Sequence, residues 1–297
     1  MPELPEVETI RLKLEPHLVG RRFDRVEIVD PRLVRPFEPV AVAAELEGER
    51  VSALERRGKY LIVRFESGRA LLIHLRMTGS LRHAAKGELA DDPHRRAVVK
   101  LDDESDVAYR DVRRFGTWQL LEPGELEPYL EERLGVEPLE RTFTARRLAQ
   151  QLEGRRAPIK AALLDQRTVA GLGNIYVDEA LWRAQVHPLR PAGTLDEDEL
   201  ARLTRSIKDA LKAGVKRQGA SLRDYSTPDG GRGSMQDRFC VYGREGFPCQ
   251  RCGTPIDKIR TAGRGTWYCP NCQRLVGQAA RSSSRRPSRS SSRHSSV

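Results

Sequence analysis

Four cysteines near the C-terminal end place the tightest constraint on how this chain folds. They form two Cys-x2-Cys pairs, Cys249/Cys252 and Cys269/Cys272, separated by sixteen residues. Each pair can direct two sulfurs at one tetrahedral ion, and this spacing is typical of a zinc ribbon. So short a hairpin has little core of its own and needs the metal to fold. Because all four ligands are cysteine, no position is left for a reacting water. We therefore expect one structural Zn2+ and no dissociable cofactor.

Two disulfides are the alternative use of these cysteines. The first residues, MPELPEVETIRLKLEP, lack the basic start and apolar run of a signal peptide, and no apolar stretch reaches the length of a membrane span. We therefore expect a cytoplasmic protein with reduced thiols and no membrane contact. The fifth cysteine, Cys240, has no Cys-x2-Cys partner, so we predict a small buried thiol there.

The charge of the chain is unevenly distributed. Lys and Arg number 52 against 42 Asp and Glu, giving +10, but the last 17 residues hold five Arg and no acid. The excess over the remaining chain suits phosphate binding and is equally common on ordinary surfaces. The Arg/Ser segment at 277–297 has almost nothing to bury, so we predict disorder; a nonspecific contact with a polyanion is the functional alternative.

Hydrophobic periodicity divides the rest of the chain into a helix, a group of strands and a group of helices. Apolar residues three and four positions apart predict an amphipathic helix over 5–19. Period-two or dense apolar runs then predict strands in an antiparallel sandwich or barrel; they are FDRVEIVD, YLIVRFE, ALLIHL, AVVKL and TWQLL, between residues 23 and 121. Helical patterns return after residue 124, around 144–153, 158–166, 174–185 and 196–216. We expect Thr194 and the following acids to open the last helix, and the polar stretch 221–234 to be a mobile loop.

The N-terminus itself is a candidate reagent. Pro2 is small, so we expect Met1 to be removed and Pro2 to carry a free secondary amine. An α-amino group titrates at about 7.7 to 8.0, so a useful fraction is uncharged near neutrality and can attack a sugar carbon to form an iminium. Glu3 beside it, with Glu6 one helical turn on, can move the protons this needs. Taken alone, Pro2 and Glu3 fit equally well as an extended lead-in to a helix.

Several separated sequence blocks decide between these readings. They are MPELPEVETIRLKLEPHLVGRRF at the start, RRGKYL at 56–61, HLRMTGSL at 74–81, DVRRFG at 111–116 and PIKAALLDQRTVAGLGNIYVDEALWRAQVHP at 158–188. With the cysteine hairpin, and in this order, they resemble the formamidopyrimidine-DNA glycosylase family from residue 1 to about 273. The resemblance implies an α+β fold of two domains. An N-terminal β-sandwich with an N-terminal helix would occupy 1–135, a helical domain with a helix-two-turn-helix 136–235 and a zinc-ribbon β-hairpin 236–276, before the tail at 277–297.

The resemblance also implies an activity and its reagents. That family removes oxidised purines, 8-oxoguanine and formamidopyrimidines, from double-stranded DNA and cleaves the strand at the abasic site by β,δ-elimination. Pro2 matches the nucleophile, Glu3 the acid/base that aids opening of the sugar ring, and Lys59 the lysine that contacts phosphate and assists the chemistry. We expect a monomer that associates with the nucleoid through DNA.

Other matched positions imply contacts with the DNA. A base must be turned out of the duplex to be excised. Met77 and Phe115 match the wedges that fill the gap, Arg113 matches the residue that bonds the orphaned base, and Arg114 suits a phosphate, although the two arginine roles could be exchanged. The resemblance also implies DNA contacts for four further residues. They are Asn174, together with the backbone N–H groups of its helix end, Arg264 in the hairpin loop, Lys160 near the lesion or its backbone, and His94.

The sequence departs from the family pattern at two places. The stretch Gly-Arg-Gly-Ser-Met-Gln at 231–236 lacks the aromatic residue often found in the loop over the extruded base, which leaves base preference open. His94-Arg95-Arg96 stands where the family usually shows two histidines. Three alternatives remain: an endonuclease VIII-type enzyme for oxidised pyrimidines, a catalytically silent DNA-binding protein, and a zinc-ribbon transcription factor. Retention of Pro2, Glu3 and Lys59 argues against the second, and the first 135 residues against the third.

Overall fold

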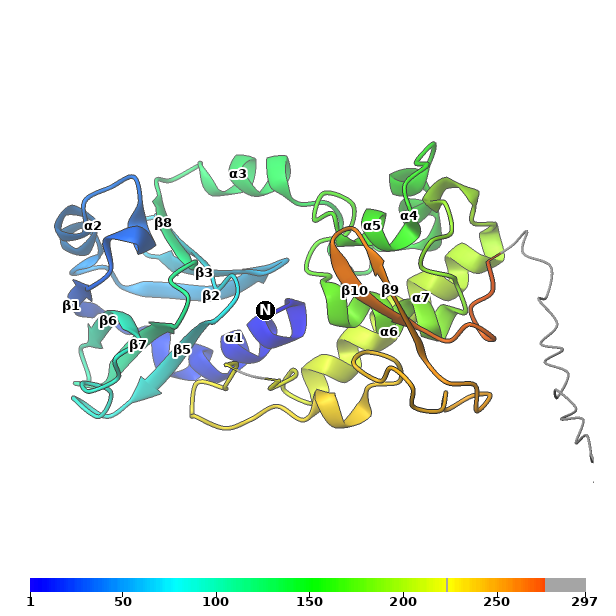
Figure 1. Ribbon diagram of the computed structural model, residues 1–297. Coiled ribbons are helices and arrows are strands. Elements are labelled where there is room, and N and C mark those ends of the chain that lie inside the picture. The colour runs from blue at the N-terminus through cyan, green and yellow to red at the C-terminus, as the bar shows by residue number, and fades with distance from the viewer. Residues whose placement is uncertain (223, 276–297) are drawn as a thin grey trace, which may run out of the picture.

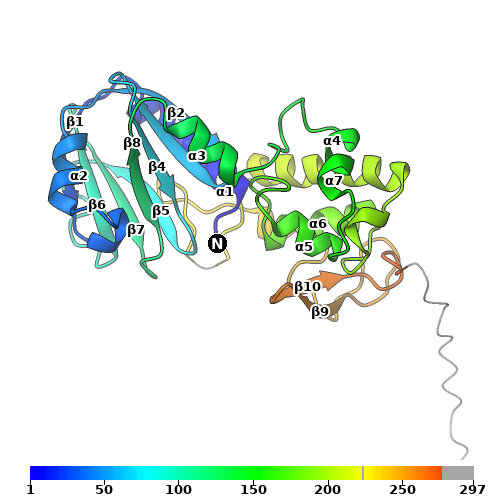
Figure 2. The same cartoon turned by 90° about the horizontal axis from the view of Figure 1, so that it is seen from above.

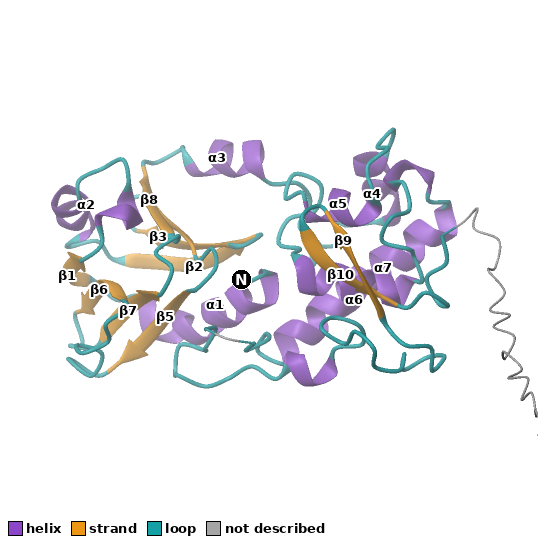
Figure 3. Ribbon diagram, viewed as in Figure 1, coloured by secondary structure: helices purple, strands orange, loops and turns teal. Residues whose placement is uncertain are grey.

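The computed structural model describes residues 1–222 and 224–275, which form a β-rich part and a helical part with the N-terminus between them (Figures 1 and 3). The β-rich part begins with helix α1 (Leu4–Leu18) and contains two four-stranded antiparallel sheets. One sheet has the order β1-β6-β7-β5: Phe23–Ile28, Arg95–Leu101, Asp106–Asp111 and Gly79–Ala84. The other has the order β2-β3-β4-β8: Val51–Arg57, Tyr60–Phe65, Ala70–His74 and Thr117–Leu121. Helix α2 (Pro39–Leu46) and the short helix η1 (Pro31–Val34) cover one end.

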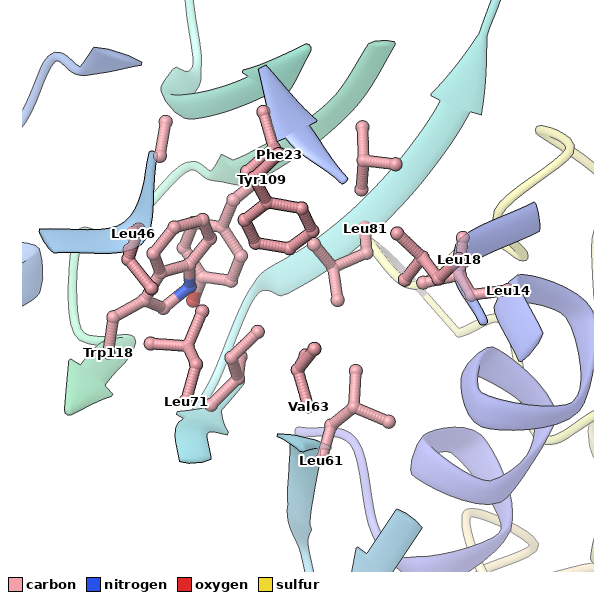
Figure 4. Packing of buried hydrophobic residues seen from close by; sticks show 14 of the residues in the cluster. Leu14, Leu18, Phe23, Leu46, Leu61, Val63, Leu71, Leu81, Tyr109 and Trp118 are labelled. Atoms are coloured by element: carbon pink, nitrogen blue, oxygen red, sulfur yellow. The ribbon is translucent and has the colours of Figure 1, made fainter. Parts of the chain in front are cut away.

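The two sheets share one apolar core, as expected for a sandwich. Phe23 from the first sheet meets Phe65 from the second edge to face, with ring centroids 5.4 Å apart. Tyr109 and Trp118, one from each sheet, make a similar contact at 5.7 Å, and Leu14 of α1 closes the core from the side (Figure 4). Burial of aromatic and branched side chains on the inner faces explains why the strand pattern was visible in the sequence.

Helix α1 joins the two parts of the molecule. Val7, Ile10 and Leu14 pack in the sandwich core, whereas Leu4 at its first turn packs in the helical core. The N–H of Leu4 also donates to the carbonyl of Gly171 at 3.0 Å. The chain terminus is therefore held between the two parts rather than on an outer surface, as the two views show (Figures 1 and 2).

The helical part follows the connecting helix α3 (Leu126–Arg133), which packs on the second sheet of the sandwich, and ends in a hairpin. Its members are α4 (Ala145–Leu152), α5 (Ile159–Leu164), α6 (Asn174–Ala184), the short η2 (Ala192–Thr194), α7 (Glu197–Lys216) and η3 (Met235–Arg238). Strands β9 (Asp257–Thr261) and β10 (Arg264–Tyr268) form the hairpin, which packs against α6 (Figure 2). Over the described residues, no helix combines the length and apolarity that crossing a membrane requires.

This architecture confirms the predicted α+β class, with a sandwich, helices and a cysteine hairpin. Three strands and one helix escaped the sequence analysis: β2, β5, β7 and α2. The expected role of Thr194 was wrong. Thr194 ends η2, and the N-cap of α7 is Asp196, whose side chain accepts from the N–H of Glu199 at 2.7 Å while the Glu199 carboxylate accepts from the N–H of Asp196. The predicted disordered tail at 277–297 lies outside the described residues.

Candidate active site

A cavity of about 490 Å³ lies where the sandwich, the helices and the chain terminus meet. Its volume falls in the usual range for small-molecule sites, about 300 to 1,000 Å³. Met1 and Pro2 line it together with groups from both parts of the molecule: Met77, Thr78 and Arg113 from the sandwich, Ile175 from α6, and Leu222, Asp224 and Tyr225 from the stretch after α7. The sequence-predicted nucleophile and two predicted DNA contacts thus share one cavity.

Glu3 is fixed by the first turn of α6. Only 2% of the residue is exposed, and its carboxylate accepts from the N–H of Ile175 at 2.9 Å and of Tyr176 at 3.3 Å. The positive end of a helix is a favourable place for an anion. Gly173 lets the carboxylate approach, because a Cβ there would lie 2.3 Å from the carboxyl carbon of Glu3.

This arrangement corrects one expectation about the Gly-Leu-Gly-Asn segment. The N–H groups of Ile175 and Tyr176 were expected to face a DNA phosphate, but Glu3 occupies them. The ligand of this helix end comes from a residue 172 positions earlier in the chain, which local sequence does not reveal.

Glu6, which the sequence analysis named after Glu3 as a possible proton carrier, is a second buried carboxylate at the cavity wall. It accepts from the N–H of Glu3 at 2.8 Å, the hydroxyl of Tyr176 at 2.9 Å and the N–H of Ala220 at 2.8 Å. Burial, reinforced by the charge of Glu3, raises the pKa of Glu6 to about 7. Glu6 thus ties the N-terminus to α6 and to the segment after α7.

Lys59 lies on the turn between β2 and β3 and points into the junction between the two parts. Its ammonium donates to the carbonyl of Leu172 at 2.7 Å, and 6% of the residue is exposed. Burial lowers the pKa of Lys59 to about 8; the nearby Glu3 opposes the shift and Arg264 adds to it. The turn is held by Glu137, which accepts from the N–H of Gly58 and from the guanidinium of Arg56.

The predicted wedge residues stand on two adjacent loops of the sandwich, and both are exposed. Met77 is 37% exposed and Phe115 51%, so neither belongs to the core. The guanidinium of Arg113 lies 4.7 Å from the centre of the Phe115 ring and, within the described chain, no carboxylate pairs with it. Their exposure leaves Met77, Phe115 and Arg113 available to a ligand at the mouth of the cavity.

One buried carboxylate, Asp111, organises both wedge loops. It accepts from the N–H of Arg113 at 3.2 Å, of Phe115 at 2.9 Å and of Gly116 at 2.8 Å, and from the hydroxyl of Thr78. Only 1% of Asp111 is exposed. The sequence analysis missed Asp111, although it begins the matched block DVRRFG.

Arg114, for which a phosphate contact is predicted, is paired with a carboxylate of the protein. Its guanidinium makes a two-pronged pair with Asp30, at 2.5 Å from Nε and 2.8 Å from Nη2. That hydrogen bonding holds the pKa of Asp30 below its ordinary value. A fork-to-fork pair of this kind fixes the arginine in the protein. Of the two neighbouring arginines, Arg113 lines the cavity and Arg114 anchors the loop.

Lys160 was expected near the lesion or its backbone, and the structure does not bring it to a surface. Its side chain has no exposed area; the ammonium lies 2.7 Å from Asp178 and donates to the carbonyl of Gly265 at 2.9 Å. Asn174 donates to the same carbonyl at 3.0 Å. Arg264, one residue before Gly265, is exposed and has no ion pair among the described residues.

His94 is half-buried and lies beside the wedge loops. Its carbonyl accepts from the N–H of Asp111 at 3.0 Å, and its ring nitrogen Nδ1 lies 3.4 Å from the guanidinium of Arg96. Arg96, the second arginine of the His94-Arg95-Arg96 stretch, therefore contacts His94 directly.

The segment after α7 contributes one deeply held side chain. Tyr225 is 9% exposed, and its hydroxyl donates to the carbonyl of Gln218 at 3.1 Å, with the carbonyl of Glu6 3.4 Å away. Leu222 and Asp224 line the cavity on either side of the single residue that is not described here. The expectation of a mobile loop over 221–234 stays a prediction.

The four cysteine sulfurs fit a zinc ion. They lie within 4.8 Å of one another, with 3.5 Å between Cys252 and Cys269 and 3.9 Å between Cys249 and Cys272. Four sulfurs bound tetrahedrally to zinc at about 2.3 Å lie roughly 3.8 Å apart. The indole N–H of Trp182 points at the Cys249 sulfur at 3.4 Å, as a donor to a thiolate does.

Cys240 lies outside this cluster and is buried, at 6% exposure. Burial raises the pKa of its thiol to about 12. It packs beside the cluster with Trp182 and Val241, which agrees with the predicted small buried thiol.

Comparisons with known proteins cover nearly all of the described chain. Residues 1–118 match the model of the formamidopyrimidine-DNA glycosylase N-terminal domain, residues 134–226 the model of the H2TH domain of the same enzymes, and residues 246–275 a zinc finger found in FPG and IleRS. The formamidopyrimidine-DNA glycosylase of Symbiobacterium thermophilum is 48% identical over 92% of this chain and 89% of its own length. That of a Roseiflexus species is 46% identical over 92% of this chain and all of its own.

Solved structures agree with the sequence relatives. A Lactococcus lactis FPG mutant in complex with DNA containing Fapy-dG superposes with a TM-score of 0.86 at 40% identity, covering 92% of this chain and all of that one. A complex of MutM with DNA containing carbocyclic 8-oxo-G gives 0.85 at 40% identity, with the same coverage.

Proposed function

This chain belongs to the formamidopyrimidine-DNA glycosylase family, and from that premise we propose that it excises oxidised purines from DNA and then cleaves the abasic strand. Excision of oxidised purines within base excision repair is the activity of the relatives, and lyase activity is characteristic of the family. The observation that carries the proposal is the cavity shared by Pro2, Met77 and Arg113. It brings a nucleophile, a wedge and a base-contacting cation to one place.

We propose Pro2 as the nucleophile once Met1 has been removed. Its secondary amine then lies in the cavity and attacks C1′ of the damaged nucleotide, and the bond to the base breaks. The base leaves with the electron pair of its bond to C1′ and takes a proton from solvent. The amine gives up its own proton, and the C1′–N bond becomes an iminium as the sugar ring opens and its oxygen takes up a proton. Loss of a proton from C2′ expels the 3′ phosphate, and a second elimination expels the 5′ phosphate.

Glu3 is the proton carrier that the geometry supports best. The N–H groups of Ile175 and Tyr176 hold its two carboxylate oxygens in place, and Glu3 directly follows Pro2 in the chain. A carboxylate fixed in this way needs no reorganisation when the ring oxygen or the amine gains or loses a proton. Lys59 has a pKa of about 8, and the charge of Glu3 acts on it. We propose that it contacts phosphate and assists the eliminations.

We propose that the sandwich loops fill the gap left by the extruded nucleotide. Met77 and Phe115 are the exposed apolar wedges, and an unstacked base step is what such side chains enter. Arg113, free of any carboxylate in the described chain, bonds the orphaned base. Arg114 holds the loop through Asp30 instead.

Backbone contacts would come from both parts of the molecule. We propose phosphate contacts for Lys59, Arg264 and His94. For Asn174 the contact would use the second hydrogen of its side-chain amide nitrogen, since the first is donated to the carbonyl of Gly265. Because the sandwich, the helical part and the zinc hairpin would each contact phosphates of one DNA strand, we predict that affinity for DNA falls steeply as the salt concentration rises.

The division of the chain into domains at 1–135, 136–235 and 236–276 is likewise a proposal. Separate apolar cores in the sandwich and among the helices, and a third small cluster around the cysteines, support it. Zinc ligation by the four cysteines fits one structural ion and no other metal role. A DNA substrate and reduced thiols support a cytoplasmic, nucleoid-associated monomer.

The proposal is tested by the ends that the protein leaves on DNA. A labelled duplex with 8-oxoguanine opposite cytosine is incubated with the protein, and the fragments are resolved without alkali. We expect a one-nucleotide gap with phosphate on both sides, the product of β,δ-elimination. A duplex with an oxidised pyrimidine serves for comparison. Faster cleavage of that duplex assigns the endonuclease VIII type, and binding without cleavage of either leaves a silent DNA-binding protein.

A further inference from the structure

We propose that Lys160 and Asp178 are positioning residues: a buried ion pair that holds the tip of the zinc hairpin so that Arg264 meets a DNA phosphate. This inference rests on the proposed function. It gives Lys160 a role through Arg264 in place of a contact of its own with DNA.

The pair is joined to the hairpin by hydrogen bonds at two points. Neither side chain has exposed area, and Lys160 Nζ lies 2.7 Å from Asp178 Oδ1. The same ammonium donates to the carbonyl of Gly265 at 2.9 Å, and Asp178 Oδ2 accepts from the N–H of Trp267 at 3.1 Å. Both ends of the ion pair thus hold the backbone of β10 just after Arg264.

Asn174 adds a third link to the same strand. Its amide donates to the carbonyl of Gly265 at 3.0 Å, so that this one carbonyl accepts from two side chains of the helical part. A Cβ at Gly265 would lie 3.0 Å from the Trp267 ring, so a larger residue at this position would crowd that ring. The peptide that follows Arg264 is therefore fixed, while the arginine side chain stays exposed.

Stability alone does not explain a pair of this kind. Removing two charges from water costs several kcal/mol per ion, and well-packed apolar residues of similar size are often as stabilising. What an ion pair adds is direction, since its hydrogen bonds are satisfied in one arrangement only. The hairpin is short and held together by its metal site, so an outside anchor is the device that sets the angle of its tip.

The same anchor also fixes the position of the hairpin relative to Pro2 and Glu3. Asn174 and Asp178 belong to the first turn and the start of the second turn of α6, and Ile175 and Tyr176 between them hold the Glu3 carboxylate. One helical turn therefore positions both the proton carrier beside Pro2 and the proposed phosphate contact. The distance from phosphate to nucleophile is set by covalent structure and by five hydrogen bonds, three to the hairpin and two to Glu3.

The test is a comparison of variants in a duplex-binding assay. Lys160→Met with Asp178→Asn removes both charges together, and the asparagine keeps an oxygen for the N–H of Trp267. Arg264→Ala removes the phosphate contact, and the triple variant combines them. Each protein is titrated with a duplex carrying a tetrahydrofuran abasic analogue opposite cytosine, over a series of salt concentrations.

We expect Arg264→Ala to weaken binding roughly tenfold and to lower the salt slope by about 1, as loss of one phosphate contact does. The Lys160→Met/Asp178→Asn variant should weaken binding several-fold with the same loss of slope. The triple variant should bind as Arg264→Ala does, because the pair then has nothing left to position.

Two results would overturn the inference. Full additivity in the triple variant means that Lys160 contacts DNA itself or acts elsewhere, and unchanged affinity of the Lys160→Met/Asp178→Asn variant means that the pair is dispensable for binding. Zinc content and the melting temperature report whether each variant folds. Should the double variant not fold, Asp178→Asn alone, which keeps the size of the side chain, is carried through the same comparison with Arg264→Ala.

A matched control comes from another ion pair of the helical part. Arg190 and Glu199 are 3.1 Å apart, largely buried, and contact neither strand of the hairpin. Arg190→Met with Glu199→Gln should leave affinity and salt slope unchanged. The proposed function fails separately, if the wild-type protein binds the abasic duplex no more tightly than an undamaged one; the comparison of variants on undamaged duplex still reads the phosphate contact of Arg264.

Discussion

The sandwich and the helical part meet at the cavity, and we call them its two walls. They place their functional residues in opposite ways. The sandwich wall rests on an apolar core and leaves Met77 and Phe115 exposed on loops tied down by Asp111. The helical wall does the reverse, because Lys160 and Asp178 are buried to hold a hairpin tip. Exposed apolar groups on one wall and buried charges on the other are both departures from ordinary burial.

The difference follows from what each wall would meet. A wedge must replace a base in an apolar stack, so its side chains wait in solvent until DNA arrives. A phosphate contact needs an aimed cation, and aiming a flexible arginine requires that the backbone beneath it does not move. In the sandwich, the exposed apolar side chains are thus the residues that would contact DNA. In the helical part, the buried charged side chains support Arg264, the residue that would contact DNA.

The largest effect we predict comes from the metal site of the helical wall. Cys249→Ala should abolish stoichiometric zinc binding and release the hairpin. Affinity for abasic duplex should fall about 100-fold or more, because the phosphate contact of Arg264 is lost and that of Asn174, whose amide is held by Gly265, is disturbed with it. Sandwich stability should change little, since its core is separate. Zinc content, duplex affinity and thermal unfolding measure this. Loss of zinc with full affinity would show that the hairpin does not bind DNA.

The next largest effect separates two adjacent arginines of the sandwich wall. Arg113→Ala should slow excision of 8-oxoguanine by about 10- to 100-fold and slow cleavage of a preformed abasic site less, because an abasic nucleotide is easier to extrude. Single-turnover rates on the two duplexes measure the ratio.

Arg114→Ala is the matched control. It should lower the melting temperature, because the buried Asp30 carboxylate loses its guanidinium partner, without changing that ratio. Equal changes in the ratio for both variants would contradict the assignment of Arg113 to the orphaned base.

Lys59 should impose a smaller, pH-dependent effect at the junction of the walls. Its pKa is lowered to about 8, so it loses its positive charge as pH rises through 8, and attraction for a phosphate weakens from that pH upward. Duplex affinity should fall a few-fold between pH 7 and 9. Lys59→Arg, which stays charged, should bind with a flatter pH profile. A wild-type profile as flat as that of the variant would remove Lys59 from the phosphate contacts.

The smallest effect should come from Cys240. As a buried thiol with a raised pKa it is a small apolar side chain, so Cys240→Ala should cost about 1 kcal/mol of stability and leave zinc content and excision unchanged. Chemical denaturation and metal analysis check this. Loss of zinc in this variant would make Cys240 part of the metal site.

Much of the fold was visible in the sequence because apolar residues are either regularly spaced or concentrated there. Helix α1 buries apolar residues three and four positions apart, and strands β3 and β4 are almost continuously apolar and buried. Strands β5 and β7 read Gly-Ser-Leu-Arg-His-Ala and Asp-Val-Ala-Tyr-Arg-Asp, which carry too little hydrophobic alternation to be recognised alone. They become strands because they pair with each other and because β7 also pairs with β6, a tertiary effect that outweighs local preference.

The site was predictable where chemistry lies in one residue type, and not where it depends on distant partners. Four cysteines at zinc spacing, or a proline beside a glutamate at the terminus, are local signals. The pairing of Asp30 with Arg114 spans 84 residues and the bond from Lys160 to Gly265 spans 105. Lys160 and Arg114 were therefore assigned to DNA from sequence, and only the fold shows that protein groups satisfy them.

The most direct test of the account is whether Pro2 becomes covalently joined to damaged DNA. The protein, with Met1 removal verified by mass, is incubated with a labelled duplex carrying 8-oxoguanine opposite cytosine and reduced with borohydride. A form with an N-terminal extension, in which the Pro2 nitrogen is an amide, serves as the control. We predict a covalent adduct that maps to Pro2 and is missing from the extended form. An adduct of equal yield in the extended form, or cleavage of the strand with no adduct in either, would contradict the assignment of Pro2 as the nucleophile.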